Sequence, residues 1–136
     1  MPANTAPIFS LLGDVQWGTI SAANTAKDGT GTVVTAFTAD ATNGGFIQKL
    51  RFSPLGTNIA TVARIFINNG STNATAGNNV LFAEVTLPAT TLTETAQLNP
   101  VEVPLNFALP PGYKINVALG TAVSAGYGIA AIGGKY

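Results

Sequence analysis

The sequence lacks most of the side chains that carry out chemistry in proteins. It contains no histidine and no cysteine, and only 9% of its 136 residues are charged. Without cysteine there is no disulfide framework and no thiolate metal site. Without histidine, a serine nucleophile would need lysine as its base, and the sequence has no S-x-x-K motif. We therefore expect a protein that is not an enzyme and that uses no cofactor or metal.

Charge is scarce and balanced. Six basic and six acidic residues give a formal net charge of zero, and the basic residues are scattered along the chain. Nucleic-acid binding, which depends on clustered positive charge, is not expected. The carboxylates are also far apart in sequence, so a hydrolase would need folding to bring an acid pair together. A net charge near zero removes self-repulsion and favours association with other copies or with a partner.

Long apolar runs are missing as well. No stretch approaches the roughly 20 apolar residues of a membrane-spanning helix, and the start of the sequence has neither a basic region nor a long apolar core. We expect no association with a membrane.

The sequence is rich in apolar residues that alternate with polar ones, as in β-strands. Tyr113, Ile115, Val117 and Leu119 alternate with smaller or polar residues, which places four large side chains on one strand face. The same reasoning predicts about eight strands, separated by Gly, Asn and Pro turns. These segments are 15–22, 32–38, 46–53, 63–67, 80–87, 101–107, 113–119 and 127–132.

This pattern predicts an all-β protein, a two-sheet antiparallel β-sandwich. Eight strands fit a jelly roll better than the seven-strand immunoglobulin arrangement, whose cysteines are missing, although an immunoglobulin-like sandwich remains the alternative. We expect one domain over residues 1–136, with an extended N-terminal arm over about residues 1–10 and a C-terminal arm over about residues 133–136.

Two loops resemble ligand sites only superficially. The glycine-rich segment 27–32 lacks the G-K-[ST] ending of a phosphate-binding loop, and we interpret it as a hairpin turn. The asparagine-rich segment 68–79 contains no carboxylate, so calcium binding would be weak. We interpret it as a long exposed loop of the kind that carries binding functions in β-sandwiches.

The aromatic residues divide into two groups. Trp17 and Tyr113 occupy strand positions that we expect to face the core. Tyr127 and Tyr136 lie in a C-terminal stretch of small residues, which would allow a neighbouring chain to approach closely.

Three stretches resemble small virion proteins of tailed bacteriophages, in particular jelly-roll capsid decoration or cement proteins of short-tailed phages. They are NGGFIQKLRFSPLGTN at 43–58, ARIFINNGST at 63–72 and LPPGYKINVALGT at 109–121. The resemblance covers most of the chain from Trp17 onward. It implies a virion protein, made in the host cytoplasm, that binds the outside of an assembled capsid as a homo-oligomer and bridges neighbouring major capsid subunits.

The expected partners are therefore the major capsid protein and further copies of this chain, as a dimer or a trimer. Multivalent binding to the assembled shell would stabilise it by mass action. The residues expected at these interfaces are Pro7, Ile8, Phe9, Arg64, Phe66, Tyr127 and Tyr136. The alternative is a carbohydrate-binding or host-receptor-binding module of a phage tail or surface, which predicts an exposed aromatic cluster.

Overall fold

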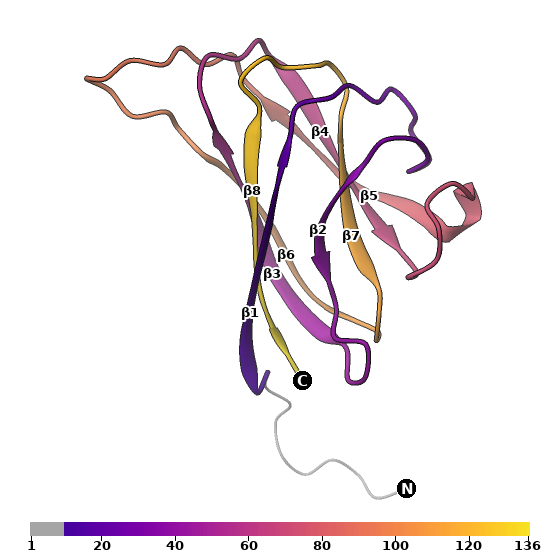
Figure 1. Ribbon diagram of the computed structural model, residues 1–136. Helices are drawn as coiled ribbons and strands as arrows, with labels where there is room; N and C mark the ends of the chain where they lie inside the picture. Colours follow the sequence, from indigo (N-terminus) through magenta and orange to yellow (C-terminus); the bar gives the residue numbers. More distant parts are fainter. Residues whose placement is uncertain (1–9) are drawn as a thin grey trace, which may run out of the picture.

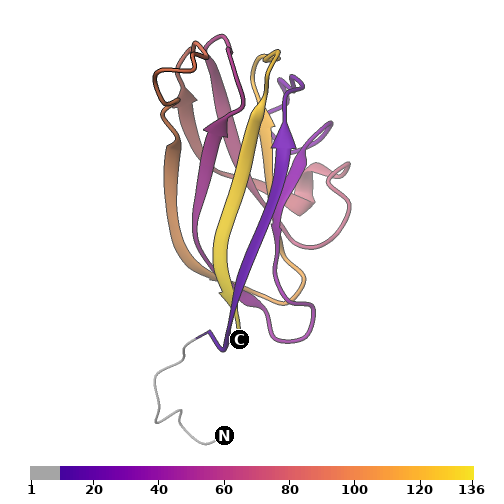
Figure 2. The ribbon, with the colours of Figure 1, turned by 60° about the vertical axis from the view of Figure 1, so that its left-hand side comes forward.

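The structure is a computed structural model that describes residues 10–136, and it consists of two four-stranded antiparallel sheets packed face to face (Figures 1 and 2). The predicted all-β sandwich is confirmed. The strands are β1 (Leu12–Ile20), β2 (Val34–Thr38), β3 (Gly45–Pro54), β4 (Thr61–Asn68), β5 (Asn79–Leu87), β6 (Val101–Leu109), β7 (Lys114–Leu119) and β8 (Tyr127–Lys135).

The strand order is that of a jelly roll. One sheet has the order β1-β8-β3-β6 and the other has the order β2-β7-β4-β5. Strand β1 pairs with β8, β2 with β7, β3 with β6 and β4 with β5. This is the pairing that results when one long hairpin is wrapped around a barrel. The immunoglobulin-like alternative, which divides seven strands between its sheets, does not describe this arrangement.

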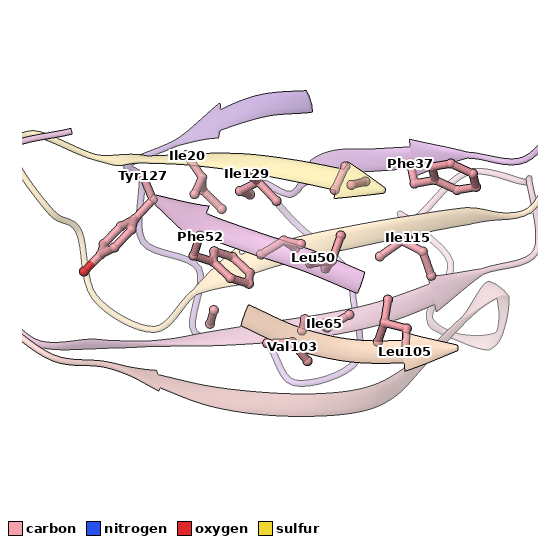
Figure 3. Close-up of a cluster of buried hydrophobic side chains, with 14 of the residues drawn as sticks. Ile20, Phe37, Leu50, Phe52, Ile65, Val103, Leu105, Ile115, Tyr127 and Ile129 are labelled. Carbon is pink, nitrogen blue, oxygen red and sulfur yellow. The ribbon is translucent and has the colours of Figure 1, made fainter. Parts of the chain in front are cut away.

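The core lies between the inner faces of the two sheets (Figure 3). Leu50 and Phe52 of β3 and Ile115 of β7 are fully buried there, together with Ile129 of β8. Inward and outward residues alternate along these strands, apart from a bulge between Ile47 and Lys49 in β3, as the spacing of apolar residues predicts. Burial raises the pKa of Tyr127, whose hydroxyl donates a hydrogen bond to the Pro88 carbonyl oxygen at 3.4 Å.

The two open sides of the sandwich are closed by side chains. On one side, Gln16 of β1 donates from Nε2 to the Thr38 carbonyl oxygen at 2.9 Å and accepts from the Thr38 backbone N–H at 2.9 Å. On the other side, the rings of Phe82 on β5 and Phe107 on β6 lie with centroids 5.0 Å apart. These contacts join edge strands of opposite sheets.

Two expectations about the ends and turns are wrong. Residues Gly133–Lys135 form the end of β8, paired with β1 and β3, so there is no C-terminal arm at 133–135. The segment 27–32 is not a hairpin turn, because β1 and β2, which it connects, belong to different sheets. The expected N-terminal arm, with Pro7, Ile8 and Phe9, lies outside the described residues except for Ser10.

Helical structure in residues 10–136 is limited to one 3-10 turn, η1 (Ala76–Asn78). Nothing helical in this part of the chain is long and apolar enough to cross a membrane.

Candidate functional site

Of the residues expected at interfaces, the four that the structure describes do not form a common surface. Phe66 and Tyr127 are wrong as contact residues, because their side chains are buried, with relative exposures of 0% and 1%. Arg64 lies on β4 with its guanidinium mostly covered, and its Nε donates to Glu84 Oε1 on the neighbouring strand at 3.1 Å. Tyr136 is half-buried, and its backbone N–H contacts the Gly44 carbonyl oxygen at 3.5 Å.

Trp17 is the most exposed aromatic residue among the large exposed apolar side chains. It is 77% exposed on the outer face of β1, so the expectation that it fills the core is wrong. The inner face of β1 is occupied instead by Gln16, Gly18 and Ile20. A Cβ at Gly18 would lie 3.0 Å from Val34 Cγ1 on β2, so this inner position has no room for an indole ring.

Trp17 belongs to an apolar band along the edge of its sheet, which we call the β1 stripe and define as Leu11, Val15 and Trp17. Val15 and Trp17 share the outward-facing side of β1, Leu11 lies directly before the strand, and each of the three side chains is at least half exposed. Figure 2 shows β1 beside β8 at this edge. On β8, Ile132 is paired with Val15 and Ala130 with Trp17, so the stripe continues onto the neighbouring strand.

Small residues beside Trp17 leave a shallow hollow of about 210 Å³. Its floor includes Gly128 and Ala130 of β8, and its rim carries the hydroxyls of Thr19 and Ser53. The indole therefore stands above a floor with little side-chain bulk. Such a raised aromatic residue next to a hollow is typical of protein interfaces, where Trp is enriched.

A charged cluster borders the apolar part of this face. Glu102 on β6 accepts from Lys49 Nζ and from Arg51 Nη1 on β3, each at 3.2 Å. In register, Arg51 is paired with Ala130 of β8 and with Glu102 of β6. The outer face of this sheet thus changes from apolar at β1 and β8 to charged at β3 and β6, as in an interface with an apolar centre and a polar rim.

Two loops lie over part of the outer face of the other sheet. The loop over residues 23–33 begins at Ala23, which is bridged to Leu119 of β7, and reaches Asn79 of β5 with its tip at Gly29. Phe66 lies on β4, between β7 and β5 in this sheet, and is buried without belonging to the core between the sheets. The loops therefore bury outward-facing residues on this side.

Asparagine side chains hold these loops together. Asn24 Nδ2 donates to the carbonyl oxygens of Thr30 and Thr32, each at 2.8 Å, and closes the neck of the first loop. Asn73 Nδ2 joins the loop over residues 69–78 to the first loop through the carbonyl oxygens of Gly29 and Gly31, at 3.1 and 2.9 Å. The predicted long loop thus exists, and its amide side chains form hydrogen bonds to loop backbone and to one another.

A polar hollow of about 170 Å³ remains between these two loops and the strands beneath them; we call it the loop pocket. Lys114 and Asn116 of β7, Thr35 of β2 and the hydroxyl residues Ser71 and Thr72 are among its lining residues. Sequence reasoning missed this pocket. The available indication was the placement of Lys114 and Asn116 at the polar positions of an otherwise apolar strand.

Most carboxylates have structural partners. Asp28 accepts from the backbone N–H and the hydroxyl of Thr30, and these hydrogen bonds lower the pKa of Asp28. The backbone N–H groups of Asn43 and Thr42 lower the pKa of Asp40 in the same way. A lowered pKa suits a turn-stabilising carboxylate rather than a general acid. Within residues 10–136, no three His, Cys, Asp or Glu residues are grouped to hold a metal ion.

Comparison of the chain with protein-family models, with curated proteins and with solved structures gives no significant match. The case for a function therefore depends on the surfaces described above.

Proposed function

We propose that the protein is a capsid decoration protein, which binds the outer surface of an assembled phage capsid and stabilises it. The observation that carries the proposal is the β1 stripe, with Trp17 exposed on a flat strand face beside a shallow hollow. Contiguous exposed apolar surface of this kind commonly marks a protein–protein interface. The proposed partner at this face is the major capsid protein.

The arrangement of the face supports docking onto a protein surface. A central apolar region, with Trp17 as its largest side chain, supplies most of the binding energy in typical interfaces. The adjoining cluster of Lys49, Arg51 and Glu102 offers both signs of charge, which would fix orientation more than affinity. Many copies bound to a repetitive shell would stabilise it even if each contact were weak.

The glycan-binding alternative has less support at this face. Sugar-binding sites combine an aromatic platform with several hydrogen-bonding side chains. The hollow beside Trp17 offers two hydroxyls, from Thr19 and Ser53, on a floor that is mostly glycine and alanine. The aromatic residues Phe82 and Phe107 lie at the side of the sandwich formed by β5 and β6. They therefore do not extend the platform of Trp17.

The test is co-sedimentation of the purified chain with assembled capsids of the phage that encodes it. The variant Trp17→Ser should weaken binding by roughly thirtyfold, since the truncation of a central interface aromatic residue often costs about 2 kcal/mol. Light scattering of the purified chain without capsids gives its mass in solution, which tests the proposed dimer or trimer. A chain that does not sediment with capsids at any concentration would contradict the proposal.

A matched pair of variants identifies the docking face. Val15 on β1 is 55% exposed, and Val80 on β5 of the other sheet is 57% exposed. Val15→Ser should weaken capsid binding, whereas Val80→Ser should leave it unchanged, because the chemical change is the same, the exposures are similar and Val80 lies on an edge strand of the other sheet, away from the β1 stripe. Equal losses in the two variants would show that the β1 stripe is not the docking surface.

A further inference from the structure

The loop pocket has a floor whose polar groups are placed by strand register. Lys114 and Asn116 lie two residues apart on β7 and therefore share the outer side of the sheet. Asn116 is paired with Thr35 on β2, and Lys114 is paired with Asn68 on β4. Three strands thus contribute to one floor, below the loop residues Ser71 and Thr72.

Asn116 has an amide nitrogen that makes no hydrogen bond within the described part of the chain. The residue is 3% exposed, and its Oδ1 accepts from Thr35 Oγ1 at 2.8 Å. Within residues 10–136 its Nδ2 donates no hydrogen bond, and no fully buried side-chain nitrogen or oxygen there lacks a partner. The Nδ2 atom is therefore reached from the pocket that Asn116 lines.

Lys114 is the only charged residue of the pocket lining within the described part of the chain, and none of the ion pairs found in residues 10–136 includes it. An ammonium group and an amide NH₂ group can only donate hydrogen bonds. The neighbouring Asn68 does not compete for a ligand, because its Nδ2 donates to Asn79 Oδ1 and its Oδ1 accepts from the Gly70 N–H. The floor therefore favours a ligand with acceptor atoms and a negative charge.

The size and the walls of the pocket restrict the ligand further. A volume of about 170 Å³ is several times the roughly 30 Å³ that one water molecule occupies in the liquid. A bare carboxylate would leave most of this space unfilled. The hydroxyls of Ser71 and Thr72 can bind ligand hydroxyls, and Thr72 Oγ1 keeps its proton for donation because it accepts from the Ala74 N–H.

We propose that the loop pocket binds a sugar acid, a six-membered sugar ring that carries a carboxylate. The carboxylate accepts from Lys114 Nζ and Asn116 Nδ2, and the ring hydroxyls contact the hydroxyl residues of the loop. The walls are held in place before binding by the Asn73 hydrogen bonds to Gly29 and Gly31, which lowers the entropic cost of binding. The site lies on the sheet opposite the β1 stripe, so it is independent of the proposed capsid contact.

The test is a titration of ¹⁵N-labelled protein followed by NMR, with three ligands that separate the two parts of a sugar acid. Methyl glucuronide carries both ring and carboxylate, methyl glucoside carries only the ring, and acetate carries only the carboxylate. Methyl glucuronide should shift the amide signals of Ser71, Thr72 and Asn116 and reach saturation. The other two ligands should bind at least about tenfold more weakly, since each lacks one set of hydrogen bonds.

Two lysine variants complete the test. Lys114→Gln should weaken methyl glucuronide binding about tenfold, because it removes a charge-assisted hydrogen bond. Lys27→Gln is the matched control: it removes the same charge from an exposed residue that does not line the pocket, and it should not change binding. Unchanged amide signals distant from the pocket verify that each variant is folded.

Three results would overturn the proposal. The first is an absence of shifts with methyl glucuronide at tens of millimolar. The second is equal affinity of the Lys114→Gln variant and the unmodified protein. The third is acetate binding as tightly as methyl glucuronide, which would reduce the pocket to a simple anion site.

Discussion

Trp17 and Phe66 occupy similar positions in their sheets but differ in solvent exposure. Both are aromatic residues on the outward-facing side of a strand, in different sheets, yet Trp17 is 77% exposed and Phe66 is fully buried. Residues 23–33 and 69–78 lie over part of the sheet that contains Phe66, and Phe66 is paired with Asn116, which lines the hollow beneath these loops, whereas the face of Trp17 is open. In this sandwich, connections between strands therefore decide which outer face is available for binding.

The largest expected effect contrasts these two aromatic residues directly. Phe66→Ala should lower the free energy of unfolding by about 3–5 kcal/mol, because it leaves a cavity under the loops. Trp17→Ala should change it by less than about 1 kcal/mol, because the indole is mostly in solvent. Urea denaturation of both variants measures the difference. Similar losses of stability in the two variants would contradict the difference in burial between Phe66 and Trp17.

A second prediction concerns the tip of the covering loop. Gly29 has φ +83°, and a Cβ there would lie 2.6 Å from Asn79 Cβ. Gly29→Ala should therefore destabilise the protein by about 2 kcal/mol, through backbone strain and a steric clash. Gly77→Ala is the control, since a Cβ at Gly77 meets nothing within 4 Å. Thermal unfolding of the two variants should separate them; a neutral Gly29→Ala would argue against close contact between loop and strand.

A third prediction concerns the hydrogen bonds that join the two loops. Asn73→Ala removes the bonds from Nδ2 to the carbonyl oxygens of Gly29 and Gly31 and should cost about 1 kcal/mol, since the site is partly exposed. Hydrogen exchange should become faster in both loops and stay unchanged in β1 and β8. Faster exchange throughout the protein would indicate that the loops and the sheets unfold as one unit.

The smallest expected effect concerns the titration of Asp28, in the loop over residues 23–33. The hydrogen bonds from Thr30 lower the pKa of Asp28 from its ordinary value of 3.8. The charged form of Asp28 is thus favoured in the folded state. Its contribution to the stability of the fold is therefore present above about pH 3.8 and is lost as the pH falls through the lower folded-state pKa. NMR titration of the Asp28 carboxyl should show this lowered value, and Thr30→Val should raise it. An unchanged pKa in that variant would contradict the proposed cause.

The alternation of apolar residues was sufficient to predict the strands and the sandwich. All eight predicted segments overlap strands, and the number of strands correctly favoured a jelly roll over an immunoglobulin-like fold. Alternation specifies which residues share a face, because side chains repeat every two residues. It does not specify what covers each face.

The candidate site was much less predictable for that reason. The segment from Val15 to Ile20 has large or apolar residues on both sides, and only the close approach of Val34 to Gly18 requires Trp17 to point outward. Phe66 and Tyr127 were predicted as contact residues, but contacts with residues distant in sequence bury both. The loop pocket likewise requires Thr35, Asn68 and Asn116 to meet from three strands. Such long-range meetings have no local sequence signature.

The pairing of β1 with β8 also has a consequence for the order of folding. Leu12 is paired with Lys135, and Trp17 with Ala130, so among the described strands the one that carries the β1 stripe has only β8, far along the sequence, as its neighbour within the sheet. Contacts over such sequence separations form slowly, because a long loop must close first. During synthesis on the ribosome, β1 must remain without its partner until β8 has emerged. The proposed docking surface is then completed only after the rest of the sandwich has been made.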